Sequence, residues 1–206
     1  MTAQQPRWDA IIVAGGRASR LGGIDKTALV YDGRSLFQRA IDAVRQAEHV
    51  SVVGSSTLAD SWKVRHTEES PRWGGPAAAI AAGLGNLRDS ESEFTAVIAA
   101  DLPHAADALR LLRDELGEVD DGIVAVDSTD RLQPLLAIYR TVALRVAANL
   151  QPSTTDLSVR QLIGSLRLRT VRLPDGLCAD IDTPADADRL GIELPSKPAL
   201  VGSAAR

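Results

Sequence analysis

The chain has 206 residues, of which 45% are hydrophobic, 24% charged and 3% aromatic. This is the composition of an ordinary globular domain, so it excludes disorder and a fibrous repeat, and the scarcity of aromatic residues argues against a stacking platform for single-stranded nucleic acid. The formal net charge of −4 provides no basic surface for polyanions, so we expect no nucleic acid partner, and any bound phosphate needs a local site.

Short apolar runs alternate with segments of helical periodicity along the chain. Such runs are typical of buried parallel strands, and apolar residues three and four apart are typical of helices that cover a sheet. The predicted strands are residues 9–13, 50–53, 64–66, 95–100, 123–126, 135–139 and 168–173. The predicted helices are residues 35–47, 76–87, 105–116, 142–150 and 159–164. This order predicts an α/β fold, a three-layer α/β/α sandwich with a Rossmann-like, mostly parallel sheet, but it does not give the strand order.

No internal repeat and no change of composition divides the chain. We therefore expect one domain over residues 1–194, followed by a flexible tail over residues 195–206, which carries prolines and small residues. Residues 1–7 lack the apolar core of a signal peptide, and the longest apolar run, residues 77–82, is far shorter than the roughly 18 residues of a membrane span. The sequence predicts a cytoplasmic protein without a membrane partner.

Cysteine and histidine usage limits the kinds of metal site. The single cysteine, Cys178, excludes an internal disulfide and a structural zinc site built mainly on thiolates. The three histidines are scattered and show no metal-ligand spacing. Cys178 is interpreted as a small apolar residue, because no cationic side chain near it in the sequence would favour a reactive thiolate.

A glycine-rich segment follows the first predicted strand. From Gly15 to Lys26 the chain holds four glycines and three cationic side chains. Glycines let backbone amides approach an anion, cations add contacts, and ligands of open α/β sheets bind beyond the carboxyl ends of strands. Neither the dinucleotide fingerprint nor the P-loop spacing is present. The segment predicts a different phosphate cradle, long enough to wrap a triphosphate; the alternative is a glycine-rich surface turn with solvated arginines.

A carboxylate follows the predicted strand 95–100. Asp101 comes directly after the strand, two residues before Pro103. A lone carboxylate in this position can hold Mg²⁺, which prefers one or two carboxylates together with substrate phosphates and water. The alternative is a helix cap or a turn residue before Pro103. The phosphate cradle predicted nearby favours metal binding by Asp101 over the role of a cap or turn residue.

These segments resemble the molybdenum cofactor guanylyltransferases. The matching residues are Ala14, Gly15, Gly16, Arg20, Gly22, Gly23, Asp25, Lys26, Asp32, Gly33, Leu36, Asp101 and Pro103. More widely, they are similar to nucleotidyltransferases of the nucleotide-diphospho-sugar transferase type, which attach a nucleoside monophosphate to a phosphorylated acceptor. The resemblance implies a GTP-binding loop over Val13, Ala14, Gly15 and Gly16. It also implies that Lys26 and Arg20 stabilise the triphosphate and that Asp101 holds Mg²⁺.

The same resemblance implies further nucleotide contacts. Gly75 and Pro76, which open a predicted helix, correspond to a Gly-Pro pair that helps hold the nucleotide. Glu68 lies seven positions before Gly75, where the family usually has Asp. Ser55, after the second predicted strand, falls near a contact that is usually Asn.

Two residues are expected on the acceptor side. Arg131 is a candidate for the pterin phosphate, and the alternative is a solvated loop arginine. Asp182, with Asp180, could line the crevice or assist a metal, although the family often has Asn at these positions. Thr183 is suited to the N-cap of a helix and Pro184 to its first position, and these positions explain both residues without any role in binding.

The resemblance implies that the chain transfers GMP from GTP to the phosphate of molybdopterin and releases pyrophosphate. The implied partners are GTP, molybdopterin and, transiently, other molybdenum-cofactor enzymes. Cytidylyl transfer to the same pterin, or nucleotidyl transfer to another phosphorylated small molecule, is the alternative within this class. A nucleotide-binding module without catalysis is the alternative from another class, and it predicts that pyrophosphate never forms.

Overall fold

The computed structural model describes residues 6–15, 25–54, 64–181, 183–192 and 194. Gly16, Arg20, Ser55 and Asp182 lie outside the described residues, and so does the predicted tail. The predictions for these residues therefore stay predictions.

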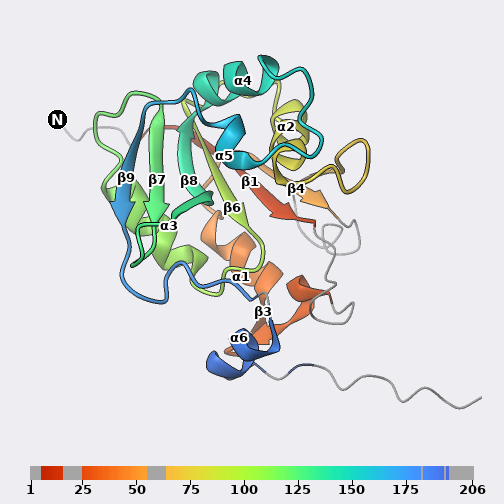
Figure 1. Cartoon of the computed structure of the whole chain (residues 1–206), viewed down its shortest axis with the longest axis vertical. Helices are drawn as coiled ribbons and strands as arrows, with labels where there is room; N and C mark the ends of the chain where they lie inside the picture. Colours follow the sequence, from red (N-terminus) through yellow and green to blue (C-terminus); the bar gives the residue numbers. More distant parts are fainter. Residues whose placement is uncertain (1–5, 16–24, 55–63, 182, 193, 195–206) are drawn as a thin grey trace, which may run out of the picture.

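Seven strands form one sheet in the order β5-β4-β1-β6-β8-β7-β9 (Figure 1). The strands are β1 (Trp8–Ala14), β4 (Val50–Gly54), β5 (Arg65–Thr67), β6 (Phe94–Ala99), β7 (Gly122–Val126), β8 (Leu132–Arg140) and β9 (Leu168–Arg172). Strand β8 runs antiparallel to β6 and β7, whereas the other pairings of this sheet are parallel. The predicted mostly parallel sheet is confirmed.

Helices cover both faces of the sheet, as Figure 1 shows with α1 and α3 below it and α2, α4 and α5 above it. The helices are α1 (Leu36–Ala43), α2 (Pro76–Asn86), α3 (Ala105–Asp114), α4 (Thr141–Asn149), α5 (Val159–Leu162) and α6 (Pro184–Arg189). Side chains of β1 alternate between the two cores: Ala10 and Ile12 belong to the core under α1 and α3, and Ile11 and Val13 to the core under α2. This alternation is the period of a strand buried on both faces, so the three-layer prediction is confirmed.

A third, smaller core joins two distant parts of the chain. Leu29 and Leu36 pack there with Ile181, Ala187 and Ile192, and α6 lies beside β3 in Figure 1. The first part begins with a single 3-10 turn, η2 (Lys26–Ala28), and continues through a hairpin of β2 (Val30–Tyr31) and β3 (Arg34–Ser35). The sequence analysis did not predict this hairpin, although its Asp32-Gly33 turn has positive φ at both residues, as a type I′ turn requires.

Helix α1 is shorter than predicted. It ends at Ala43 rather than Ala47, because Val44 and Ala47 donate to carbonyls three residues back, which replaces the helical ladder with turns. Ser35 is its N-cap, in a capping box with Gln38.

Strand β8 begins at Leu132, three residues earlier than predicted. The register with β7 shifts between Val124 and Ala125, so Pro134 falls in an irregular stretch where its missing N–H interrupts no ladder bond to β7. The predicted helix start at Thr183 is confirmed, since Thr183 and Asp186 form a capping box. Among the described residues, no helix has the length and apolar character needed to cross a membrane.

Candidate functional site

Two predicted catalytic side chains lie together at the carboxyl end of β6, beside β1. The amide of Ala100 donates to the carbonyl of Val13 (3.0 Å), which extends the strand pairing to the residue before Asp101. The Nζ of Lys26 lies 3.4 Å from Oδ2 of Asp101. The two side chains are 19% and 24% exposed, so both are partly shielded and still open to a ligand.

Local structure positions Lys26. Asp25 is the N-cap of η2: its Oδ1 accepts from the backbone N (3.0 Å) and the Oγ1 (2.6 Å) of Thr27, which is buried. The amide of Leu36 donates to the carbonyl of Leu29 (2.9 Å), and both leucines lie in the third core. Asp25, a residue of the predicted binding motif, therefore shapes the backbone that carries Lys26.

Arg39 of α1 ties the loop after β6 to the hairpin after η2. Its Nε donates to the carbonyl of Pro103 (2.7 Å) and its Nη1 to the carbonyl of Tyr31 (3.3 Å). The guanidinium also lies 4.9 Å from the centre of the Tyr31 ring. Sequence reasoning missed Arg39, because it sits in the polar stripe of an ordinary amphipathic helix.

The loop after β1 begins against the end of β4. A Cβ on Gly54 would lie 2.7 Å from the carbonyl carbon of Ala14 and 2.8 Å from the amide N of Gly15, and Gly54 has a φ of +140°. Only glycine permits both the approach and the conformation. Val13, Ala14 and Gly15 of the predicted nucleotide loop therefore reach the carboxyl edge of the sheet beside Asp101.

An acidic side chain does face this loop, but it belongs to Glu69. A Cβ on Gly15 would lie 3.6 Å from Oε1 of Glu69, and the same oxygen accepts from the backbone N of Trp73 (3.2 Å). Glu68, which the sequence analysis selected by its offset, pairs instead with Arg72 (3.1 Å). The hydrogen bonds of this loop, which the sequence does not reveal, direct the two neighbouring carboxylates differently, and the predicted contact of Glu68 with the nucleotide stays a prediction.

Gly75 and Pro76 begin α2, as predicted. Gly75 has a φ of +92°, and Pro76 occupies the first turn, where its missing N–H leaves no bond unmade. The amide of Asp156 donates to the carbonyl of Gly74 (2.8 Å), which fixes the approach to the helix. Gly75 has no side chain to cap α2, and the amides of a first helical turn are donors of the kind that an anion accepts from.

The turn between β7 and β8 is built around Asp127. Its Oδ1 accepts from Thr129 N (2.9 Å), Thr129 Oγ1 (2.7 Å) and Arg131 N (3.0 Å), and its Oδ2 accepts from Gln133 Nε2 (2.9 Å). These bonds, the Thr129 hydroxyl first, lower the pKa of Asp127 to about 2. Sequence reasoning missed this residue.

Arg131, predicted on the acceptor side, lies in this turn and is exposed. No ion pair joins its side chain to another described residue. The turn follows β7. Only β8 lies between β7 and β6 in the sheet, so β7 and β6 are about 10 Å apart at the spacing of neighbouring strands. Arg131 thus follows a strand that ends at the same edge of the sheet as β6, two strand positions from the strand that leads to Asp101. Asp180 is exposed in the segment that leads to Asp182.

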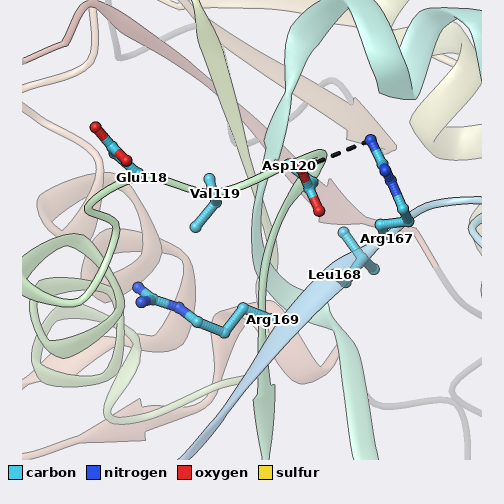
Figure 2. A pocket seen from close by; sticks show the side chains of 6 residues that line it. All are labelled: Glu118, Val119, Asp120, Arg167, Leu168 and Arg169. Atoms are coloured by element: carbon cyan, nitrogen blue, oxygen red, sulfur yellow. Dashed lines mark ion pairs between the residues drawn. The ribbon is translucent and has the colours of Figure 1, made fainter.

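A hollow of about 530 Å³ opens at the opposite edge, where β7 and β9 begin. Glu118, Val119, Asp120, Arg167, Leu168 and Arg169 line it, and Figure 2 shows Arg167 paired with Asp120. The two atoms of this pair are 3.6 Å apart. Because ligands of open α/β sheets bind at the carboxyl edge, we assign no part of the nucleotide site to this hollow.

A family model described as the MobA-like NTP transferase domain matches residues 10–170. The chain belongs to this family. The resemblance seen in the sequence is confirmed, and the protein is a nucleotidyltransferase by family. The matched range contains Lys26, Asp101, Gly75 and Arg131, and it ends before Asp182.

The relatives agree with this assignment. A protein of Opitutus terrae named "Probable molybdenum cofactor guanylyltransferase" is 30% identical over 204 residues, which cover 92% of this chain and 97% of that protein. A molybdopterin-guanine dinucleotide biosynthesis protein A from Archaeoglobus fulgidus has a similar structure, with a TM-score of 0.63, 19% identity, and coverage of 88% and 96% of the two chains. An inositol-1-phosphate CTP transferase from T. maritima has a TM-score of 0.70 at 16% identity, covering 91% and 95%. At these identities the two structures show the fold alone.

Proposed function

We propose that this protein transfers GMP from GTP to the phosphate of molybdopterin and releases pyrophosphate. The family and the names of its relatives support this reaction. The observation that carries it is the 3.4 Å separation of Lys26 Nζ and Asp101 Oδ2 at the carboxyl edge of the sheet. A nucleotidyltransferase needs this combination of cation, metal-binding carboxylate and backbone amides where the triphosphate lies.

The chemistry needs few protein groups. The acceptor phosphate is largely ionised at neutral pH, because the second pKa of a phosphate monoester is about 6, so it attacks the α-phosphorus without a general base. The barrier then comes from charge repulsion and alignment. Lys26 offsets the charge of the phosphates, the amides after β1 orient them, and pyrophosphate leaves in line with the attacking oxygen.

Asp101 fits the ligand set of Mg²⁺. It is a single, partly exposed carboxylate at the ligand edge, and Mg²⁺ is usually held by one or two carboxylates and completed by phosphates and water. Asp101 would hold the ion, and a bound Mg²⁺ would supply positive charge that offsets the negative charge of the reacting phosphates. Arg131, exposed at the same edge, is suited to the phosphate of the acceptor.

Cytidylyl transfer is the second candidate, because a structural neighbour with a TM-score of 0.70 is named as a CTP transferase. Calorimetric titration of the purified chain with GTP, CTP, ATP and UTP in the presence of Mg²⁺ separates the two. We expect GTP to bind about a hundredfold more tightly than CTP, or roughly 3 kcal/mol. A preference for CTP would favour the cytidylyl reaction, and the absence of binding by all four would contradict the phosphate cradle.

The role of Asp101 is tested by Asp101→Ala. We expect turnover to be lost while the circular dichroism spectrum and the unfolding midpoint stay close to those of the parent. Asp107→Ala is the matched control, since Asp107 is a largely exposed carboxylate in the first turn of α3. Turnover by Asp101→Ala at the parental rate would remove Asp101 from the mechanism.

A further inference from the structure

Three potential metal ligands gather at the amino edge of the sheet, opposite the Lys26 pair. Asp9 is the second residue of β1, and Glu48 and His49 precede β4. The amide of Glu48 donates to the carbonyl of Trp8 (2.9 Å), and the amide of Ala10 donates to the carbonyl of His49 (2.9 Å). This pairing brings one ligand atom of each of the three side chains within 4.8 Å of the others.

The carboxylate of Asp9 lacks a full set of partners. Its side chain is completely buried. Its Oδ1 accepts from Ser92 Oγ (2.9 Å) and lies 3.2 Å from Nδ1 of His49. Its Oδ2 is buried and has no hydrogen-bond partner among the described residues. Burying a carboxylate oxygen without a partner is costly, so this geometry favours an additional cation beside Asp9.

Arg7 does not fill this role, because its guanidinium is directed to Glu48. Its Nε and Nη2 donate to the two carboxylate oxygens of Glu48 at 2.5 and 2.7 Å. Oε2 of Glu48 also lies 3.2 Å from Oγ of Ser92. A carboxylate has about four lone-pair positions, so Glu48 can hold Arg7 and Ser92 and still bind a cation. Asp9, Glu48 and Arg7 together leave one negative charge when His49 is neutral.

We propose that Asp9, Glu48 and His49 bind a divalent transition-metal ion of the Zn²⁺ type. Two carboxylates and one imidazole are a suitable ligand set for such an ion, and water completes the coordination. The side chains of Glu48 and His49 are 31% and 36% exposed, which gives the ion access from solvent. The site joins the start of β1 to the start of β4, so the bound ion stabilises the folded chain.

This site is independent of the nucleotide site. Asp9 is the second residue of β1 and Ala14 is its last, so they are five residues apart, or about 16 Å at the rise of a strand. The ion therefore cannot replace Mg²⁺ on Asp101, and its loss leaves the residues of the nucleotide site in place.

Calorimetry on the full chain, without an affinity tag and stripped by a chelator, tests the proposal with Zn²⁺ as the probe. We expect one equivalent of Zn²⁺ to bind without nucleotide and to raise the melting temperature. Asp9→Asn and His49→Gln should each weaken binding at least tenfold. Two controls should bind as the parent does: Asp101→Asn, which changes the nucleotide site, and His66→Gln, which removes a half-buried imidazole that contacts the carbonyl of Gly54.

Three outcomes would overturn the proposal: no stoichiometric Zn²⁺ in the parent chain, undiminished binding by His49→Gln, or loss of binding in Asp101→Asn. The partly exposed His49 keeps the test decisive if Asp9→Asn does not fold, which circular dichroism would reveal. Replacement of Zn²⁺ by Co²⁺ adds a spectroscopic test, because nitrogen and oxygen ligands give visible absorption bands that His49→Gln should shift or abolish.

Discussion

Lys26 Nζ and Asp101 Oδ2 lie 3.4 Å apart, although 75 residues separate them in the chain. Lys26 is held by the Asp25 cap and the third core, and Asp101 by the end of β6 next to β1. Two independent parts of the fold therefore supply opposite charges to one point at the carboxyl edge. This arrangement suits the proposed reaction, in which Asp101 would hold Mg²⁺ and Lys26 would offset the charge of the phosphates.

Replacing Lys26 by Met should slow nucleotidyl transfer about a hundredfold, because a single charged contact to a transition state contributes roughly 3 kcal/mol. The pair with Asp101 is partly exposed, so we expect little change in the unfolding midpoint. Steady-state kinetics and thermal melts check the two effects. Arg110→Met, which removes an exposed cation on α3, is the control and should retain parental kinetics. Parental kinetics in Lys26→Met as well would exclude Lys26 from the site.

Gly83 and Gly85 of α2 offer a matched pair for the packing of this helix on β1. A Cβ on Gly83 would lie 2.7 Å from Cγ2 of the buried Ile11, whereas a Cβ on Gly85 would meet no atom within 4 Å. Gly83→Ala should therefore destabilise the chain by about 1–2 kcal/mol, because overpacking exceeds the gain in helix propensity. Gly85→Ala should stabilise it by about 0.5–1 kcal/mol. Urea denaturation measures both; equal effects of the two substitutions would show that α2 does not pack on Ile11 as described.

Asp127 should make the stability of the chain sensitive to acid. Its pKa is lowered to about 2 in the folded chain and is about 3.9 for an unperturbed Asp. The unfolded chain therefore binds more protons between these values, so this contribution is complete above about pH 4 and is lost as the pH falls towards 2. Asp127→Ala should lower the urea midpoint at pH 7, and its difference from the parent should shrink as the pH approaches 2. A difference that stays constant over this range would contradict the lowered pKa.

The thiol of Cys178 should react slowly. Burial and, second, the negative charge of Asp127 raise its pKa to about 11. The thiolate is the reactive form, so at pH 8 a disulfide reagent should modify the native protein about a hundredfold more slowly than the protein unfolded in guanidinium. Asp127→Ala should raise the native rate, because it removes the second cause. Equal rates in the native and unfolded protein would show that the thiol is not shielded.

The alternation of apolar runs with amphipathic segments was sufficient to predict the layers and most strands. Strands that are buried on both faces are continuous apolar runs in the sequence, and the helices that cover them are amphipathic segments. The β2-β3 hairpin was not predicted, because each of its strands has only two residues, which is too few for a periodic pattern. The turn residues Asp32 and Gly33 were the signal that could have revealed it. The start of β8 at Leu132 was not predicted, because a proline such as Pro134 indicates the end of a strand unless the register shift beside it is known.

Motif spacing was sufficient to select Lys26, Asp101 and Gly75 from the sequence, and the structure brings the side chains of Lys26 and Asp101 together, while the binding roles of all three stay predictions. The site was not predictable where the choice depends on side-chain direction. Glu68 and Glu69 are equivalent in the sequence, and only the bond from the amide of Trp73 and the closeness of Gly15 distinguish Glu69. Asp9 and His49 lie 40 residues apart, and the scattered histidines gave no metal spacing because the parallel pairing of β1 and β4 creates the cluster.

The central claim is nucleotidyl transfer at the Lys26–Asp101 edge, and an isotope-tracing assay tests it most directly. The chain is incubated with Mg²⁺, molybdopterin and GTP labelled either at the α- or at the γ-phosphate. The account predicts that the α-label enters a pterin dinucleotide, that the γ-label leaves as pyrophosphate, and that Asp101→Asn does neither. Release of the γ-label as inorganic phosphate, or no acceptor-dependent product from the α-label, would contradict it.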